Sequence, residues 1–338
     1  MFGIIGLGGI YRDAYWESVA FLKKKDVIIY DVDKEALESA LLLAEKSGCE
    51  YIAANSITEV FKKAEGICLF LPPKAIISVI KEGIDSKVEL KTKKIYIEKP
   101  LGINFQEALE IYKLLTSVGI VLYYNEVFLH SSTTDVLVEE LLTGRHGAIQ
   151  SIEMNFNGSV PANITRQWRG KSETGGMVWH DWGIHSVGLL LGILKRLSID
   201  YTKIDVDTIE VSNFLWQEIN EDKVLVQSQA NINIEDIDIS ILASWINKTD
   251  NEMRVYFCDG CYFEIVISKI DGTSSWNLFE VDIHGKRKLL TQSRYPKERF
   301  IRSLTAFIWG RNPEFTDYNL GVKAMEIVDY LLEKSKNI

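Results

Sequence analysis

The segment Ile95-Tyr96-Ile97-Glu98-Lys99-Pro100 combines residues that are suited to chemistry. Its first three residues have the pattern of a buried strand, so Lys99 lies where that strand leaves its sheet. An amine at the end of a strand, beside a carboxylate and before a rigid proline ring, is suited to handling protons. A surface Glu–Lys pair that closes the strand is the alternative, and the segment alone does not decide between the two.

A glycine-rich turn near the start of the chain predicts a nucleotide site. The turn, from Gly6 to Tyr11, follows an apolar segment and precedes a helical pattern, so its amides and the helix N-terminus suit a pyrophosphate. Tyr11 replaces the third glycine of the GxGxxG fingerprint. Asp31 ends the next apolar segment, where a carboxylate binds a ribose diol and repels a 2′-phosphate. This pattern favours NAD over NADP, and a similar fold without a nucleotide is the alternative.

Leu71-Pro72-Pro73 ends another apolar segment on the same predicted edge. Its stiff backbone either packs beside the dinucleotide or only ends the strand. The predicted cofactor-binding residues are Gly6, Leu7, Gly8, Gly9, Ile10, Asp31, Leu71, Pro72, Glu98 and Lys99.

A second informative segment runs from Gly175 to His185. If it is helical from about Gly176, Asp181 and His185 lie four residues apart on one face, and the carboxylate can fix the tautomer of the imidazole. An ordinary pair on a core helix is the alternative. Two glycines, two tryptophans and a second histidine, His180, indicate more than packing, and His180 is a candidate substrate contact.

Upstream of that segment lie cationic and aromatic residues, Arg166, Trp168 and Arg169. They suit the mouth of a pocket and an anionic group on a substrate, whereas surface arginines are the alternative.

The Cys258-Asp259-Gly260-Cys261 segment has the spacing of a zinc or redox motif. The other two cysteines, Cys49 and Cys68, are isolated, so two zinc ligands are missing. Asp259-Gly260 between β-rich segments predicts a two-residue hairpin turn with Cys258 and Cys261 as cross-strand neighbours. The sequence therefore predicts structural thiols and no metal site.

The composition excludes several classes of partner. The 338 residues carry a formal net charge of −9, with 46% hydrophobic and 25% charged residues. This charge argues against nucleic acid or an anionic membrane as the main partner, and no apolar run is long enough to cross a bilayer. The chain enters a strand from its first residues, so a cytoplasmic location without a signal peptide is expected.

The first third alternates apolar strands with helical segments, which is typical of a doubly wound parallel sheet. The predicted strands are Gly3–Gly6, Val27–Tyr30, Glu50–Ile52, Gly66–Leu71, a strand beginning at Ile95, and Gly119–Tyr124. The helices between them are predicted from Ile10 to Lys24, Lys34 to Ser47, Ile57 to Lys63, Lys74 to Glu82 and Phe105 to Ser117.

From about residue 125, β-rich segments follow one another without helices between them, which predicts a mostly antiparallel sheet. They are Ile149–Phe156, Asp207–Trp216, Val224–Ile232, Ile237–Trp245, Met253–Phe257, Tyr262–Ile267 and Trp276–Ile283. Helices are predicted at Ser131–Leu142, within Gly158–Leu194, and at Lys297–Gly310 and Leu320–Lys334. The fold class is therefore α/β, with a Rossmann domain at 1–124 and an α+β domain at 125–338 that carries a large open sheet. The exposed face of that sheet favours a homodimer or homotetramer.

Taken together, these motifs resemble the glucose-fructose oxidoreductase/inositol dehydrogenase (Gfo/Idh/MocA) family along the whole chain. The shared residues are the glycine turn, Asp31, Glu98-Lys99-Pro100, Trp168-Arg169 and the Asp181-x-Gly183-x-His185 pattern. The resemblance implies three catalytic residues: Lys99 at the substrate hydroxyl and nicotinamide, His185 as acid/base, and Asp181 in proton handling. It also implies that these residues contact the substrate, so the predicted substrate-binding residues are Lys99, Asp181 and His185 together with the candidates Trp168, Arg169 and His180.

The chain departs from the family pattern at several positions. Tyr11 and Met177 stand where the family often has glycines, Ile76 near a usual histidine, and Gly188 where an acid follows the catalytic histidine. The expected activity is NAD(P)-dependent hydride transfer at a secondary hydroxyl or ketone of a sugar, sugar derivative or cyclitol. The alternatives are a redox-neutral enzyme that recycles bound NAD and a non-catalytic dinucleotide-binding regulator.

Overall fold

The computed structural model describes residues 1–21, 26–85, 89–160, 168–174, 176–219, 222–246, 251–270, 273–293, 297–310 and 318–336. By internal contacts the chain forms two compact units. Unit 1 comprises Met1–Val127 and Phe300–Val322, and unit 2 comprises Phe128–Arg299 and Lys323–Ile338. The segment Phe300–Val322 therefore packs within unit 1, although the sequence assigns it to the second part. The 1–124 and 125–338 domains stay a prediction.

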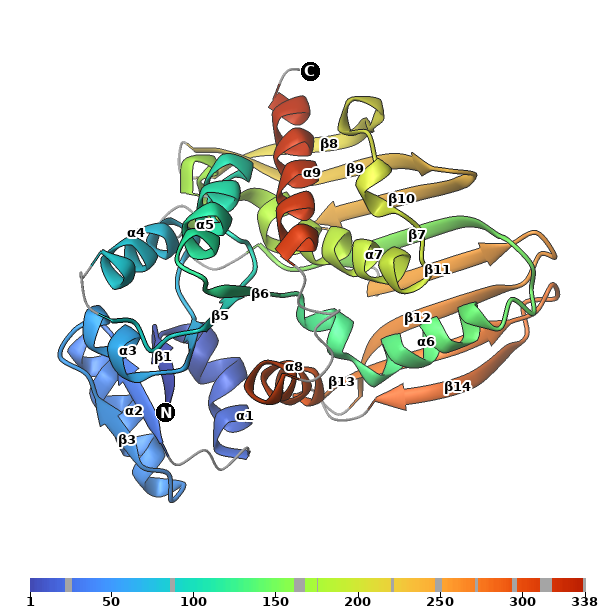
Figure 1. Ribbon diagram of the computed structural model, residues 1–338. Helices are drawn as coiled ribbons and strands as arrows, with labels where there is room; N and C mark the ends of the chain where they lie inside the picture. Colours follow the sequence, from blue (N-terminus) through green and yellow to red (C-terminus); the bar gives the residue numbers. More distant parts are fainter. Residues whose placement is uncertain are drawn as a thin grey trace. The chain divides into compact units, whose positions relative to one another are not determined.

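Unit 1 is built on a six-stranded parallel sheet with the order β3-β2-β1-β4-β5-β6 (Figure 1). This order reverses between β1 and β4, as in doubly wound folds whose ligands bind at the carboxyl ends of the strands. The strands are β1 (Phe2–Ile5), β2 (Val27–Tyr30), β3 (Tyr51–Ala53), β4 (Gly66–Leu69), β5 (Lys94–Glu98) and β6 (Val121–Asn125). The helices that follow them are η1 (Tyr11–Tyr15), α1 (Trp16–Phe21), α2 (Lys34–Lys46), α3 (Ile57–Lys63), α4 (Pro73–Ile84) and α5 (Phe105–Ser117).

Polar side chains fix where the helices of unit 1 begin. Asp33 caps α2, Ser56 caps α3 and Asn104 caps α5, each accepting a backbone N–H of the first turn. Such caps satisfy amides that would otherwise lack a partner within the helix. Because α2, α3 and α5 follow β2, β3 and β5, these caps mark where the chain passes from loop to helix after those three strands.

A late part of the chain completes the core of unit 1. Helix α8 (Glu298–Trp309) contributes Phe307, whose ring lies 6.0 Å from Phe2, 5.4 Å from Tyr96 and 5.2 Å from Tyr123 between centroids. Lys94 Nζ also donates to the backbone oxygen of Phe307 at 2.5 Å. The strands β1, β5 and β6 therefore depend on a segment from far along the chain for part of their packing.

Unit 2 is built on an eight-stranded sheet with the order β14-β13-β12-β11-β7-β10-β9-β8 (Figure 1). All of its neighbouring pairs are antiparallel except β7 and β10, which run parallel. The strands are β7 (Ile149–Asn157), β8 (Glu210–Ile219), β9 (Asp222–Ile234), β10 (Ile237–Ser244), β11 (Asn251–Phe257), β12 (Tyr262–Ile270), β13 (Thr273–Val281) and β14 (Arg287–Ser293).

Helices cover one face of this sheet. Helix α7 lies against β7 and β10, and α6 lies against β13 and β14 (Figure 1). The helical segments of this part are η2 (Val127–His130), α6 (Ser132–Leu142), η4 (Trp168–Gly170), η5 (Ser172–Thr174), η6 (Trp179–Gly183), α7 (Ile184–Arg196), η7 (Tyr201–Lys203), η8 (Val206–Thr208) and α9 (Tyr318–Lys336). The alternation of β7 follows from this: Ile152, Met154 and Phe156 are buried under the helices.

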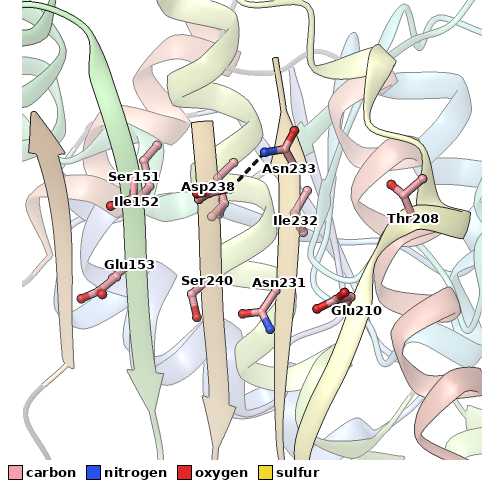
Figure 2. A pocket seen from close by; sticks show the side chains of 11 residues that line it. Ser151, Ile152, Glu153, Thr208, Glu210, Asn231, Ile232, Asn233, Asp238 and Ser240 are labelled. Atoms are coloured by element: carbon pink, nitrogen blue, oxygen red, sulfur yellow. Dashed lines mark hydrogen bonds between the residues drawn. The ribbon is translucent and has the colours of Figure 1, made fainter. Parts of the chain in front are cut away.

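The opposite face of the sheet carries a polar hollow of about 450 Å³. Figure 2 shows its side chains on β7, β8, β9 and β10, with Asn233 Nδ2 donating to Asp238 Oδ1 at 3.0 Å. Three carboxylates, from Glu153, Glu210 and Asp238, line it among serine, threonine and asparagine side chains. Since α7 covers the other face of β7 and β10, the polar side chains that these two strands contribute to the hollow point away from α7.

The predicted fold class is confirmed: a parallel doubly wound sheet is followed by a large, mostly antiparallel one. The strand β14 was missed, because Arg287-Lys288-Leu289 has the polar composition of an exposed edge. The start of β8 was placed too early, since Val206–Thr208 forms a 3₁₀ turn. Among the described residues, no helix is both long and apolar enough to span a bilayer.

The predicted two-residue turn between Cys258 and Cys261 is wrong. Phe257 N donates to Cys261 O and Gly260 N donates to Phe257 O, so the loop contains three residues, with Gly260 at φ +84°. A type I turn followed by a left-handed glycine is a common alternative for such a hairpin. Cys261 therefore lies opposite Phe257 rather than Cys258.

Candidate active site

The glycine turn of unit 1 is open on the side where a pyrophosphate would lie. Gly6 has φ +94°, and a Cβ there would lie 2.4 Å from the backbone oxygen of Phe70, so only glycine fits. A Cβ on Gly8 would meet nothing within 4 Å. The turn therefore approaches β4 closely at Gly6 and leaves free space above Gly8, which fits a nucleotide phosphate at a helix N-terminus. Asp13, in the first helical turn, adds a negative charge near Gly9.

Asp31 is held against this turn at the end of β2. Its Oδ2 accepts Leu7 N–H at 2.6 Å and its Oδ1 accepts Asp33 N–H at 2.9 Å. Each carboxylate oxygen keeps a further lone pair for a ribose hydroxyl. The side chain of Leu7 is buried, whereas that of Ile10 is 42% exposed, so Leu7 offers only its backbone and Ile10 offers apolar surface.

Leu71 and Pro72 lie beside the same turn. A Cβ on Gly6 would come within 2.9 Å of Leu71 Cδ2, which places the leucine side chain against the turn. Pro72 is the N-cap of α4, and β4 already ends at Leu69. The segment therefore follows the end of β4 and lies beside the glycine turn, and its contact with a dinucleotide stays a prediction.

Tyr11 fills the space that the missing third glycine leaves. Its ring is fully buried 6.0 Å from Phe70 and 6.3 Å from Trp16 between centroids, and its hydroxyl donates to Tyr51 at 3.3 Å. The first helical turn, Tyr11–Tyr15, is a π-helix rather than the predicted α-helix. π-helical turns are frequent at functional sites, and here the turn buries both Tyr11 and Tyr15 in the core.

Glu98 is buried in a hydrogen-bonded network at the carboxyl end of β5. Its Oε1 accepts from the Tyr15 hydroxyl and from Asn125 Nδ2. Tyr15 and Tyr96 hydroxyls lie 2.8 Å apart, and Tyr96 reaches Ser303 at 2.7 Å. Burial raises the pKa of Glu98 and raises the pKa of Tyr15 well above its usual value, so the tyrosine proton stays in place as a donor. The surface-pair alternative is therefore wrong for Glu98.

Lys99 follows Glu98 and precedes Pro100 through a cis peptide bond. Its side chain is half-buried, and its charge acts on the pKa of Glu98 in the lowering direction, against the larger effect of burial. Asn125 sits opposite Glu98 in the register of β5 and β6. The carboxyl edge of the sheet thus carries the ammonium of Lys99 next to the buried, hydrogen-bonded carboxylate of Glu98.

This network predicts a pH-dependent difference between the wild type and Glu98→Gln. Burial raises the pKa of Glu98 in the folded protein above the value of 4.5 that it has when exposed. Between these two pKa values the folded protein binds more protons than the unfolded chain, so its free energy of unfolding falls as the pH rises through the folded-state pKa. Glutamine keeps an acceptor for Tyr15 and Asn125 but does not titrate. The free energy of unfolding of the wild type relative to the variant should therefore be lower at about pH 7 than at about pH 5. Denaturant titrations at both pH values measure it, and a pH-independent difference would contradict the buried carboxylate.

Asp181, in unit 2, is bound by two donors. Arg169 Nε donates to Oδ1 at 3.0 Å and Trp245 Nε1 donates to Oδ2 at 3.2 Å. The Arg169 guanidinium also lies over the Trp168 ring, with Cζ 4.6 Å from its centroid. Thus Arg169 holds the carboxylate of Asp181 in place, although the sequence analysis considered this arginine for an anionic group on the substrate. Arg166 lies outside the described residues.

A close backbone approach brings Arg169 to Asp181. A Cβ on Gly176 would lie 2.2 Å from the backbone oxygen of Trp168, so the η4 segment can contact the start of η6 only over a glycine. Met177, where the family often has a glycine, has φ +75°, the region that favours glycine. Its sulfur accepts Leu225 N–H at 3.4 Å, which shows how the side chain is accommodated.

His185 lies at the start of α7, whereas Asp181 lies in the π-helical turn η6 that precedes it. The segment is helical from Met177 onward, as considered from the sequence, but Trp179–Gly183 forms a π-helical turn before α7 begins at Ile184. The His185 ring is half-buried and stacks on Phe128 at 4.5 Å between centroids, at an angle of 23°. Trp182 lies 6.1 Å away on another side. Aromatic packing thus orients the imidazole.

His180 is fully buried. Its Nδ1 lies 2.8 Å from the backbone oxygen of Gly176, and its Nε2 lies 3.4 Å from Asp329 Oδ1 on α9. These contacts tie η6 to α9 within unit 2. They give His180 a role in positioning η6, and its contact with a substrate stays a prediction.

Both parts of the chain match models of known protein families. Residues 1–126 match the family model described as an oxidoreductase family with an NAD-binding Rossmann fold. Residues 137–262 match the model of the GFO/IDH/MocA C-terminal domain. No curated protein matches the sequence.

Solved structures share the fold at low sequence identity. KijD10, a 3-ketoreductase from Actinomadura kijaniata in complex with NADP and TDP-benzene, has a TM-score of 0.73 at 15% identity, covering 98% of this chain and 96% of that chain. The UDP-N-acetylglucosamine 3-dehydrogenase GnnA from Acidithiobacillus ferrooxidans has a TM-score of 0.68 at 14% identity, covering 98% and 95%. A super-repressor mutant of Gal80p from Saccharomyces cerevisiae has a TM-score of 0.80 at 13% identity, covering 99% and 96%. With both of its parts matched by family models, this chain belongs to the Gfo/Idh/MocA family of oxidoreductases, with an NAD-binding Rossmann fold.

Proposed function

We propose that this protein is an NAD-dependent dehydrogenase or reductase that acts on a secondary hydroxyl or ketone of a sugar, sugar derivative or cyclitol. The observation that carries the proposal is the setting of Lys99. It is a half-buried cation at the carboxyl end of β5, beside a buried carboxylate, on the edge where doubly wound sheets bind their ligands. Family membership supplies the reaction class.

NAD held by the glycine turn and Asp31 would supply the acceptor for the hydride of the carbinol C–H bond, whose carbon would become the ketone. In that direction His185 takes the hydroxyl proton as the general base, and the ammonium of Lys99 stabilises the oxygen as it gains negative charge. Asp181, fixed by Arg169 and Trp245, supports substrate binding and proton handling at His185. Trp168 and Arg169 complete the proposed substrate-binding residues.

We propose NAD as the preferred cofactor. Asp31 offers carboxylate lone pairs to a ribose diol next to the glycine turn, and its negative charge opposes a 2′-phosphate. The proposed contacts comprise the amides of the turn, the apolar surface of Ile10 and Leu71, and the Glu98–Lys99 edge. NADP is the weaker cofactor in this proposal, although it is the cofactor in the KijD10 complex.

The substrate class includes nucleotide-linked sugars. KijD10 is in complex with a TDP derivative and GnnA is named for a UDP-sugar, both on this fold. The screen that tests the function therefore offers the full-length protein free sugars, sugar phosphates, nucleotide sugars and inositols, with NAD and NADP in parallel. Reduced nicotinamide should form with at least one class, and faster with NAD. Absence of any hydride transfer, both under multiple turnovers and with enzyme in excess over NAD, would refute the proposal.

A dinucleotide-binding regulator is a second candidate, which the similarity to Gal80p favours. It predicts NAD binding by calorimetry without hydride exchange between labelled polyols and NAD. A redox-neutral enzyme would exchange hydride between labelled polyols and NAD yet accumulate almost no NADH. Measuring hydride exchange and NADH together therefore distinguishes it. The Lys99, Asp181 and His185 set favours an enzyme over the regulator.

We also propose a homodimer or homotetramer that associates through the open face of the eight-stranded sheet, and a cytoplasmic location. The hollow of Figure 2 makes part of this face polar, so hydrogen bonds would contribute to such an interface. Analytical ultracentrifugation of the full chain gives the mass of the assembly.

A further inference from the structure

The hairpin between β11 and β12 brings together three side chains that commonly bind metals. The ligand atoms of His146, Asp259 and Cys261 all lie within 4.8 Å of one another. His146 precedes β7, whereas Asp259 and Cys261 belong to the hairpin loop, and none of them is part of the candidate active site. We propose that these three residues bind a divalent cation that prefers nitrogen and sulfur ligands, of which Zn²⁺ is the representative.

The carboxylate of Asp259 is oriented by the hairpin itself. Its Oδ1 accepts Cys261 N–H at 2.9 Å, which directs Oδ2 toward His146 Nδ1, also at 2.9 Å. The His146 ring packs against Phe257 and Phe263, at 5.1 Å and 5.5 Å between centroids, and its side chain is only 13% exposed. Two of the three ligands are therefore fixed by surrounding packing before any ion binds.

The second nitrogen of His146 has a carboxylate partner. Nε2 lies 3.1 Å from Glu280 Oε1, the arrangement that commonly supports a metal-bound histidine from behind. Arg145 Nε lies 3.2 Å from the same nitrogen and would donate to it in the other tautomer. With the proton on Nε2, His146 donates to Glu280 and presents the Nδ1 lone pair to the cation. A bound cation selects this tautomer.

The same geometry argues against a nucleophilic Cys–His–Asp triad. In such a triad the carboxylate binds one imidazole nitrogen and the thiol binds the other. Here Asp259 lies at Nδ1, while Nε2 faces Glu280 and Arg145. Both nitrogens of His146 thus already have carboxylate partners, unlike the imidazole of such a triad, and a shared cation is the explanation that we favour for the cluster.

The charges around the cluster suit a cation. Arg145 is paired with Glu140 at 2.7 Å and with Glu280 at 3.1 Å, and Lys288 is paired with Glu280 at 3.1 Å. These ion pairs offset the positive charges of Arg145 and Lys288. Asp259 and a thiolate of Cys261 then supply two negative charges at the ion.

The ligand set is that of a zinc site with one open position. Bond lengths of about 2.0 to 2.3 Å in a tetrahedron place ligand atoms roughly 3.3 to 3.8 Å apart, so small side-chain rotations suffice to close the present spacing. Sulfur, nitrogen and carboxylate oxygen together favour zinc over Mg²⁺ and Ca²⁺. Water occupies the fourth position in this proposal.

Cys258 provides a matched control. It lies in the same loop, three residues before Cys261, it is exposed, and it is not part of the cluster. Its replacement by serine removes one thiol from the CxxC spacing while leaving the proposed ligands intact. A site built on the CxxC motif would need both cysteines, whereas the proposed site needs only Cys261.

The test uses the full-length, tag-free protein, freed of metal by a chelator and kept reduced. Equilibrium dialysis against Zn²⁺ should give about one ion per chain, and His146→Gln and Cys261→Ser should each weaken binding by at least about tenfold. Co²⁺ should give a thiolate charge-transfer band in the wild type and Cys258→Ser, and none in Cys261→Ser. Circular dichroism verifies that each variant is folded.

The outcomes decide the proposal. Zinc binding of well below one ion per chain in the folded wild type overturns the site. Equal loss of zinc in Cys258→Ser and Cys261→Ser overturns the assigned ligands, as does a charge-transfer band that survives Cys261→Ser. Retention of binding by Cys258→Ser, with loss in His146→Gln and Cys261→Ser, supports them.

Discussion

Lys99→Ala is expected to lower kcat by at least about 100-fold, which corresponds to about 2.7 kcal/mol of transition-state stabilisation. The reason is that the variant loses the cation proposed to hold the substrate oxygen as it becomes an alkoxide. The affinity for NAD should change much less, because the glycine turn and Asp31 remain intact. Steady-state kinetics with a substrate identified in the screen, together with NAD titration, measure both quantities.

Lys93→Ala is the matched control for this prediction. Lys93 is exposed and lies just before β5, at the opposite end of the strand from Lys99. Its replacement should leave kcat within about twofold of the wild type, since isolated surface changes have small effects. A Lys99→Ala enzyme with nearly wild-type turnover would refute the assigned role, provided that the variant unfolds at the wild-type temperature.

His185→Ala should also lower kcat by at least about 100-fold, the lower end of the usual range for loss of a general acid or base. Its distinguishing readout is the pH profile. The wild-type rate of alcohol oxidation should rise with pH as the base becomes deprotonated, and the variant should lose this limb. His185→Gln keeps a polar side chain near Phe128 but cannot accept the proton, so its profile should match that of the alanine variant.

His284→Ala serves as the control for His185, because His284 is an exposed histidine in the loop between β13 and β14. It should keep both the rate and the pH profile of the wild type. If His185→Ala retained the pH-dependent limb, another group would be the base, and Asp181 would be the next residue to replace.

The sequence predicted the cofactor half of the fold well because the signals there are local. Alternating apolar strands and helices indicate a doubly wound parallel sheet, and the usual hand of the crossovers restricts its strand order to a few possibilities. Asp31 and Lys99 were found because each directly follows a predicted strand, and parallel strands share one carboxyl edge. Asn125 ends β6 at that same edge, so the same rule would have found the partner of Glu98.

Other features could not be predicted because they depend on tertiary packing. Tyr15 reaches Glu98 only through a π-helical turn that no helical periodicity indicates. Trp245 binds Asp181 from the end of a strand far along the chain. The contact between His146 and Asp259 is likewise not predictable from sequence spacing, since the two residues lie 113 positions apart in the chain.

The parallel pair of β7 and β10 has a consequence for how unit 2 folds. The strand β7 is made first, yet its neighbours are β10 and β11, so that Ser151 pairs with Asp238 and Met154 pairs with Met253. Hairpins such as β9–β10 and β11–β12 can form locally, whereas β7 must wait for both groups of strands. High contact order of this kind slows folding. The central strand of the sheet is therefore expected to be its last to be enclosed, leaving its apolar face in need of protection during synthesis.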